Sequence, residues 1–368
     1  MGMTSRERML IALSNGRPDR LPCQVHGWMD YYLKNSLDAM DWMEANERFG
    51  FDQAIYISPD YIYSDRDLSH WTTTVEDMGI LDDGYSHFIE TIQTPDGQLT
   101  VHRAKNDFTV WDLQPLVKNW DEFKIWEKWR PIPIRADFTK MEELRIRLGD
   151  KGIIRSHPYS AGQGSPWQSL CILMGTEEAI YAAIDEPDMT HNALEVIMQQ
   201  TLKTTELWKG IPADMVEVGG GAGSNTVISP NMYREFCLPY DLQQNEAFHT
   251  CKLKVVTHLC GGLMKQLDHV VASGTDGLET MTPRSMGGDC DLAEASRRVG
   301  KRLFLIGGFD QNAGFEKGTP EVVRKMVFEC FNATKDQAGY IIAPSDHFFV
   351  GDPANLQAFC DAAKECTY

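Results

Sequence analysis

Short apolar runs recur along this chain, and longer stretches with helical character separate them. Strands that alternate with helices in this way are typical of βαβ units, which build parallel sheets. Eight such units in 368 residues predict a (β/α)8 TIM barrel as one domain over residues 1–368, with an open doubly wound sheet as the alternative. The expected strands are Leu21–Gly27, Phe51–Ser58, Gly152–Tyr159, Asp214–Gly219, Leu253–Cys260, Gly277–Met281, Leu303–Phe309 and Gly339–Pro344.

Helix and turn signals support this reading. Ser229-Pro230 and Thr319-Pro320 each place a capping hydroxyl before a proline suited to the first helical turn. Thr4 and Glu7 have the spacing of a capping box, so residues 1–20 are expected to form an N-terminal helical extension. Two alternating segments within His87–Ala104 flank the turn signal Thr94–Gly97, which predicts a β-hairpin insertion between the second and third strands.

Composition restricts the setting and the partners. The net charge of -18 argues against a nucleic-acid partner, because the phosphates would be repelled. No apolar run approaches the roughly 18 residues that span a membrane, and the start of the chain lacks the apolar segment of a signal peptide. The nine cysteines are scattered without the spacing of a disulfide framework, so we expect reduced thiols in a cytoplasmic protein.

Polar side chains gather where the expected strands end. Barrel enzymes carry their active sites at the carboxyl ends of the strands, so these side chains are the candidates for chemistry. In chain order they are His26 and Trp28, Tyr56, His157 and Tyr159, Glu217, His258 and Cys260, Glu279, Asp310, and Asp346 with His347.

The sequence Thr257-His258-Leu259-Cys260-Gly261-Gly262 contains the clearest candidate ligands. Residues two apart on a strand face the same way, so His258 and Cys260 can reach one ion, and imidazole and thiolate are ligands that zinc prefers. A buried histidine beside a core cysteine would give the same pattern. Glu217 is a candidate third ligand, although it could instead form a salt bridge across the barrel mouth. His347 or Asp346 would be the fourth, and we favour His347.

The other candidates have stronger structural readings. His157 is a candidate catalyst and Tyr159 a candidate substrate contact, but both would also suit a polar layer at the rim. Asp310 is a candidate catalyst that could equally cap the following helix. His26, Trp28, Glu279 and Asp346 are candidate substrate contacts.

Several motifs resemble the uroporphyrinogen decarboxylase superfamily over nearly the whole chain. They are Ser5–Met9 with Arg17–Pro22, Ile228–Pro230 with Leu238–Tyr240, His258–Gly261 and Gly307–Asp310. The resemblance implies a (β/α)8 barrel. True decarboxylases of this family use no metal and bind substrate carboxylates through arginines after the first strand, and Cys23–Asp30 contains no arginine. The corrinoid (cobalamin)-dependent methyltransferases of the family hold zinc through a His-x-Cys-Gly motif, which His258 and Cys260 match, with an acidic ligand near Glu217.

One departure from the methyltransferase pattern bears on the substrate. Enzymes acting on coenzyme M carry a second cysteine after the last strand, where this chain reads Ala343-Pro344-Ser345-Asp346. Fewer thiolates donate less charge, which leaves zinc a stronger Lewis acid. The resemblance therefore implies a demethylase that passes a methyl group from a small donor, such as a methyl ether, to a corrinoid protein.

Two other functions stay open at this point. The first is a metal-free decarboxylase or lyase that acts on a different small carboxylate through Asp310 and His157. The second is a corrinoid-binding or regulatory barrel without catalysis.

Overall fold

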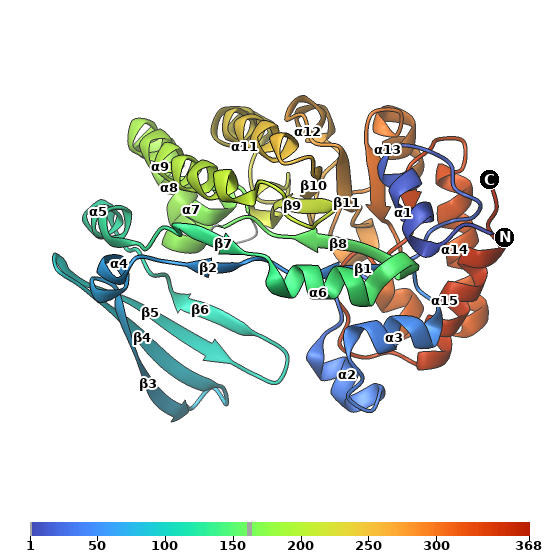
Figure 1. Cartoon of the computed structure of the whole chain (residues 1–368), viewed down its shortest axis with the longest axis horizontal. Helices are drawn as coiled ribbons and strands as arrows, with labels where there is room; N and C mark the ends of the chain where they lie inside the picture. Colours follow the sequence, from blue (N-terminus) through green and yellow to red (C-terminus); the bar gives the residue numbers. More distant parts are fainter. Residues whose placement is uncertain (1, 160–163) are drawn as a thin grey trace.

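The computed structural model describes residues 2–159 and 164–368, and its centre is a curled parallel sheet of seven strands (Figure 1). Neighbouring strands follow one another in the chain, apart from the step from the first strand to the second. In sheet order they are β1 (Gln53–Tyr56), β8 (Gly152–Ser156), β9 (Met215–Gly219), β10 (Lys254–His258), β11 (Gly277–Thr280), β12 (Phe304–Gly307) and β13 (Tyr340–Ile341). Each lies within one of the expected strands, so seven of the eight expected runs contribute to the α/β sheet.

The prediction for the first expected strand is wrong, because Leu21–Gly27 does not form a regular strand. Its one bridge to the sheet pairs Cys23 with Ile342 in parallel. The Cys23 carbonyl also accepts a hydrogen bond from the Asp52 amide beside β1, so the segment contacts both edges of the sheet. It does not form a regular strand because Pro22 has no N–H, and the Cys23 amide donates to the Asp52 carboxylate instead.

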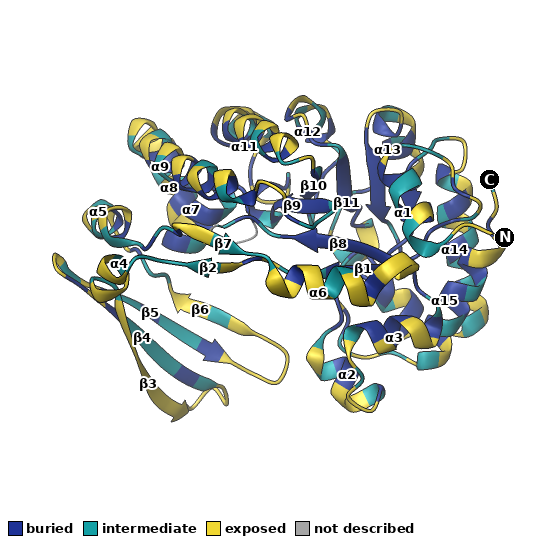
Figure 2. Ribbon diagram, in the orientation of Figure 1, coloured by how far each residue is buried: buried dark blue, intermediate teal, exposed yellow. Residues whose placement is uncertain are grey.

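Helices follow the strands and cover the outside of the sheet, whose strands are almost entirely buried (Figure 2). The expected caps are confirmed, because Thr4 and Glu7 form a capping box and Ser229 and Thr319 each cap a helix. The helices of the barrel are α1 (Ser5–Leu13), α2 (Asp30–Ser36), α3 (Trp42–Phe49), α6 (Thr139–Leu148), α7 (Pro166–Met174), α8 (Thr176–Asp185), α9 (Pro187–Thr205), α10 (Pro230–Met232), α11 (Leu238–Thr250), α12 (Leu267–Ala272), α13 (Leu292–Val299), α14 (Pro320–Thr334) and α15 (Pro353–Glu365).

A long insertion separates β1 from β8. Strands β4 and β5 pair antiparallel around the turn at Thr94–Gly97, in the segment where a hairpin was expected, and two further strands extend them to a four-stranded sheet. This sheet projects from the side of the molecule at which the carboxyl ends of the parallel strands lie (Figure 1). The elements of the insertion are β2 (Asp60–Ile62), α4 (Asp65–Ser69), β3 (Thr72–Ile80), β4 (Ser86–Thr94), β5 (Gly97–Lys105), β6 (Val110–Gln114), α5 (Trp120–Trp129) and β7 (Arg135–Asp137).

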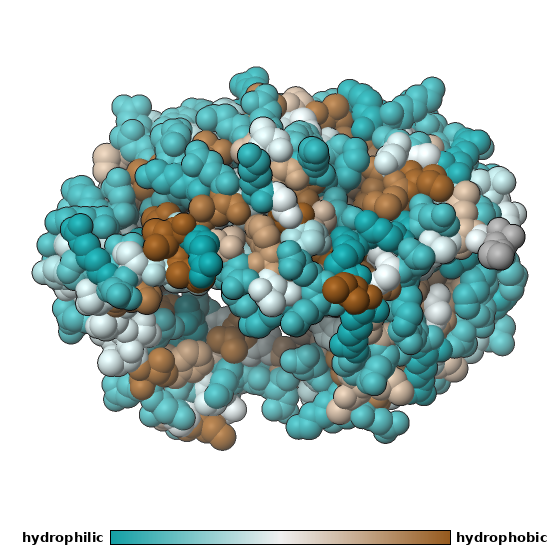
Figure 3. Space-filling model, viewed as in Figure 1, coloured by the Kyte–Doolittle hydropathy of each residue, from teal (hydrophilic) through white to brown (hydrophobic). Residues whose placement is uncertain are grey.

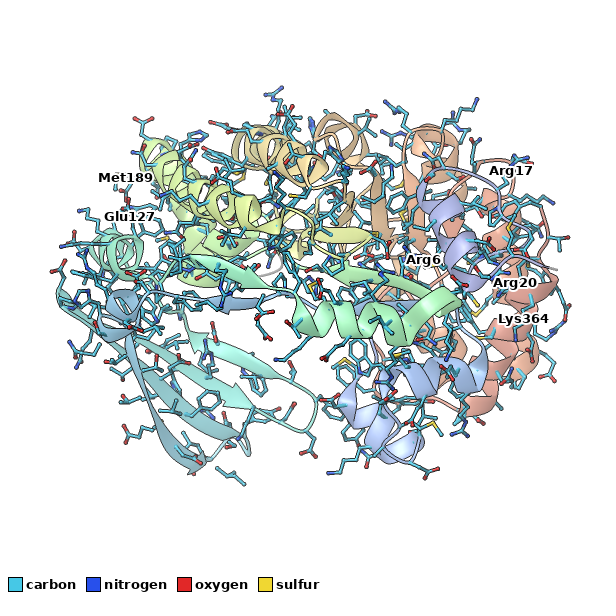
Figure 4. The ribbon with its side chains drawn as sticks, viewed as in Figure 1. Arg6, Arg17, Arg20, Glu127, Met189 and Lys364 are labelled. Atoms are coloured by element: carbon cyan, nitrogen blue, oxygen red, sulfur yellow. The ribbon has the colours of Figure 1, made fainter. Side chains whose placement is uncertain are left out.

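Helix α1 closes the amino-terminal end of the barrel. Its Met9 packs in one apolar cluster with Ile153, Met215 and other side chains of the strands. Ion pairs hold the helix there: Arg6 contacts Asp214 at 2.6 Å and Arg8 contacts Asp52 at 2.7 Å. Figure 4 labels Arg6, which belongs to this helix. The interior of the sheet is therefore sealed at this end.

Among the described residues, no helix is both long and apolar enough to cross a lipid bilayer.

Candidate functional site

Polar side chains form the second layer inside the sheet, directly above the apolar layer that α1 seals. Alternation along each strand explains the layers: in β9, Met215 belongs to the sealed cluster, Val216 packs against the outer helices, and Glu217 faces inward again. The same step of two residues places a polar group on each of five adjacent strands. The five are Tyr56, Arg155, Glu217, His258 and Glu279.

Arg155 joins the two carboxylates of this layer. Its Nη2 lies 2.7 Å from Oε2 of Glu217 and 2.8 Å from Oε2 of Glu279, and its side chain is 0% exposed. The guanidinium carbon lies 4.3 Å from the centroid of the Tyr56 ring, and the Tyr56 hydroxyl donates to Glu217. A buried charge is tolerated only when it is paired, and here one arginine neutralises part of the charge of two acids.

His258 lies between the same two carboxylates. Its Nδ1 is 3.3 Å from Oε1 of Glu217 and 3.1 Å from Oε1 of Glu279. Burial disfavours the charged imidazole, but hydrogen bonds with Cys260, Glu217 and Glu279 outweigh it and hold the pKa of His258 well above its ordinary value.

The pKa values of the two acids are shifted in opposite directions. Burial opposes ionisation of Glu217, yet the hydrogen bond from His258 and the charge of Arg155 hold its pKa well below the usual range. Burial raises the pKa of Glu279, and the charge of Arg155 does not fully offset that effect. Glu217 is thus the carboxylate that stays charged most readily.

Four side chains place ligand atoms close enough to share a metal ion. Donor atoms of His26, Glu217, His258 and Glu279 all lie within 4.8 Å of one another, and all four residues are buried. Zinc bonds of about 2.0–2.1 Å put the ligands of a tetrahedral site roughly 3.3–3.4 Å apart. The separation of 3.3 Å between Oε1 of Glu217 and Nδ1 of His258 is of that size, so this pair has the spacing of two metal ligands.

Two of the four expected metal ligands, Glu217 and His258, are in this group. The other two lie at its edge. Cys260 is half-buried beside His258, and a side chain at Gly221 would come within 2.8 Å of its Sγ. His347 is exposed, and its ring centroid lies 5.0 Å from that of His26. His26 and Glu279, expected as substrate contacts, occupy the inner positions instead.

The remaining candidates lie around the mouth or outside it. His157 stacks on Tyr56 with ring centroids 4.7 Å apart, and burial lowers its pKa. Asp310 caps the following segment by accepting from the Ala313 amide, and it also accepts from Ser285. The Asp346 carboxylate accepts from the amide of His347.

Trp28 and Tyr159 face away from the four-donor group. Trp28 is buried among aromatic rings, and its indole N–H donates to Asn46. Tyr159 donates to the Pro131 carbonyl and packs against Arg130.

Arg155 is the residue that the sequence reasoning missed. A signal was present, because a charged residue at the centre of the apolar run Gly152–Tyr159 is rarely buried without a partner. Arg155 also comes two residues after Ile153, whose side chain faces inward, so the side chain of Arg155 faces inward as well.

Comparison with known proteins identifies the class of this barrel. The family model described as "Uroporphyrinogen decarboxylase (URO-D)" matches residues 144–366, more than half of the chain. The chain therefore belongs to the uroporphyrinogen decarboxylase family.

Individual relatives are distant. A uroporphyrinogen decarboxylase of Xanthomonas axonopodis pv. citri is 27% identical over 204 residues, which cover 50% of this chain and 53% of the relative. One of Chlorobium phaeobacteroides is 24% identical over 238 residues, 60% of this chain and 63% of the relative. The chain thus matches about half to three fifths of the length of these curated relatives.

A solved structure extends the similarity of fold to the full chain. It is a methyltransferase from Methanosarcina mazei, with a TM-score of 0.64 at 14% identity, and the match covers 99% of both chains. At this identity the match supports the shared fold.

Proposed function

We propose that this protein is a zinc-dependent methyltransferase that moves a methyl group between a small donor, such as a methyl ether, and a corrinoid protein. The observation that carries the proposal is the buried group of two histidines and two carboxylates, with a thiol beside it, in a barrel sealed at its other end. The fold shared with a methyltransferase supports the proposal. We further propose that the segment Leu21–Gly27 occupies the eighth position and closes the barrel.

In this proposal Glu217, His258 and Cys260 hold zinc, and His26 takes the place that we expected for His347. When bound, zinc supplies a Lewis acid that polarises the heteroatom of the donor and makes it a better leaving group. Glu279, whose carboxylate Arg155 holds in place, remains beside the ligands as the polar neighbour of His258. Arg155 and Tyr56 hold the carboxylate of Glu217 in place.

Porphyrinogen decarboxylation receives less support from the site. A substrate with several carboxylates needs several free cations, and the arginine inside the barrel, Arg155, is already paired with two acids. The metal-free alternative that uses Asp310 is also weakened, because both oxygens of that carboxylate accept hydrogen bonds outside the four-donor group.

Metal analysis and a transfer assay test the proposal together. The purified protein should contain about one zinc per chain, and it should methylate free cob(I)alamin from a suitable methyl ether. Cys260→Ser should lose most of the transfer while costing only about 1 kcal/mol in the free energy of unfolding, because Cys260 lies at the open mouth. Cys251→Ser is the matched control, since Cys251 is also half-buried but packs beside Thr205, away from the site.

Protein that remains metal-free yet turns over a methyl donor would refute the zinc proposal. Unchanged transfer in Cys260→Ser, with Cys251→Ser behaving the same, would remove the thiol from the site.

A further inference from the structure

A separate cavity lies between the antiparallel sheet and the barrel. Its volume is about 380 Å³, within the range of small-molecule pockets. The space-filling view is hollowed between the projecting sheet and the rest of the molecule (Figure 3). Most of the lining is apolar or aromatic, contributed by Leu68, Trp71, Leu116, Trp126, Ile172 and Leu173.

Arg130 is the polar group that distinguishes this cavity. Its guanidinium carbon lies 4.8 Å from the ring centroid of Trp126 and 4.5 Å from that of Tyr159, so two aromatic faces hold it in place. Nη1 donates to Gln200 at 3.1 Å. No Asp or Glu forms an ion pair with Arg130 in residues 2–159 and 164–368.

The second arginine in the lining is already neutralised. Arg103 contacts Asp112 at 2.8 Å and also pairs with Glu90. Asp112 also lines the cavity but is paired with Arg103, so Arg130 is the lining cation left to attract an anion.

Tyr159, which lines the cavity, comes soon after the end of β8, so the cavity lies near the carboxyl ends of the strands. Tyr159 also comes two residues after His157, a span of at most about 7 Å. His157 stacks on Tyr56, whose hydroxyl donates to Glu217. One ligand can therefore have its body in the cavity and still point toward the barrel mouth.

We propose that this cavity binds an organic acid with an apolar body of about one aromatic ring, and that Arg130 holds its carboxylate. A guanidinium binds a carboxylate through two parallel hydrogen bonds, and the surrounding rings exclude water and accept the apolar body. Identifying this acid with the methyl donor rests on the proposed function, but the binding itself does not.

Calorimetric titration of chelator-treated, metal-free protein tests the site without the methyl-transfer chemistry. The probes are 3-phenylpropionate and its neutral amide, which share the apolar body and differ in charge. We expect the acid to bind at least tenfold more tightly than the amide. Arg130→Met should weaken the acid about 10- to 100-fold, the loss expected for hydrogen bonds to a charged group, and should leave the amide nearly unchanged.

Three further variants separate recognition from general damage. Arg130→Lys keeps the charge but loses the planar fork, so its affinity for the acid should be intermediate. Leu116→Phe should weaken both probes by filling the cavity while leaving Arg130 in place. Arg302→Met, which changes an exposed arginine outside the cavity lining, should bind both probes like the wild type.

Equal binding of acid and amide, an unaffected Arg130→Met, or no binding of the acid to the wild type would overturn the proposal. Each of these outcomes can be distinguished from a failure of the proposed function. Acid binding through Arg130 without any methyl transfer would refute the methyltransferase, whereas transfer without acid binding would refute this cavity as the site of recognition.

Discussion

Replacing Arg155 with methionine would test whether the charges inside the barrel depend on one another. Arg155 is fully buried and lies within 2.8 Å of both carboxylates, so its removal leaves Glu217 and Glu279 with His258 as the neighbouring cationic group. Breaking a buried ion pair by removing one partner costs about 3–5 kcal/mol. We expect the metal-free variant to lose that much in the free energy of unfolding.

Added zinc should reverse much of this loss. Without Arg155, no fixed cation competes with a metal for the two carboxylates, so zinc should bind the variant more tightly than the wild type. A ligand present at 100 times its dissociation constant stabilises the folded state by about 2.7 kcal/mol. Urea denaturation with a chelator, and then with excess zinc, measures both effects in the same protein.

Arg145→Met is the matched control. Arg145 pairs with Asp214 at 2.6 Å near the sealed end, so its loss should also destabilise the fold, but zinc should not restore it. The reasoning would be refuted if Arg155→Met lost less than about 1 kcal/mol in chelator. Zinc that stabilised Arg155→Met no more than the wild type would equally contradict a cation site at these carboxylates.

Two further predictions concern stability away from the mouth. Burial raises the pKa of Asp241 from 3.8 to about 7, although the hydrogen bond with Tyr233 has a smaller, lowering effect. The folded protein therefore holds the proton of the Asp241 carboxyl group more tightly than the unfolded chain does. The free energy of unfolding should therefore fall by up to roughly 4 kcal/mol as pH rises from about 4 to 7. In a pH series of urea titrations, Asp241→Asn should flatten this fall. If the free energy of unfolding of Asp241→Asn fell as steeply as that of the wild type, the prediction would be contradicted. Asp52→Asn should lower the free energy of unfolding by about 3–5 kcal/mol in the same assay at neutral pH, because Asp52 is fully buried and pairs with Arg8 and Arg20. A loss below 1 kcal/mol would show that the two arginines do not depend on Asp52.

Strand positions and strand ends were predictable from the sequence because both follow from local pattern. Apolar runs located seven strands, and the carboxyl ends of these strands placed Glu217 and His258 at one site. The reasoning for Cys260 used the two-residue period of a strand, but β10 ends at His258 and the backbone turns at Gly261, whose φ is 96°. Cys260 therefore lies beside the four-donor group rather than in it.

Other residues depended on contacts that no local pattern encodes. We compared His347 with Asp346 as neighbours on a strand, but β13 ends at Ile341, so alternation no longer applies to them. His26 belongs to the inner group because the irregular segment at Leu21–Gly27 contacts both edges of the sheet. Arg155 was visible only as a charge within an apolar run, and its two partners come from strands far along the chain.

The two ends of this barrel use paired charges for different purposes. At the sealed end, Asp52 and Asp214 precede their strands and bind arginines of α1, with Arg20 and Arg145 as further partners, so these carboxylates hold the helix in place and are fully paired. At the open end, Arg155 pairs with Oε2 of Glu217, and Oε1 of the same carboxylate faces the imidazole of His258. Because the apolar layer below excludes water, attraction between that oxygen and a metal is weakly screened. Glu217, whose pKa the hydrogen bond from His258 and the charge of Arg155 hold low, therefore offers a metal an ionised oxygen at the open end.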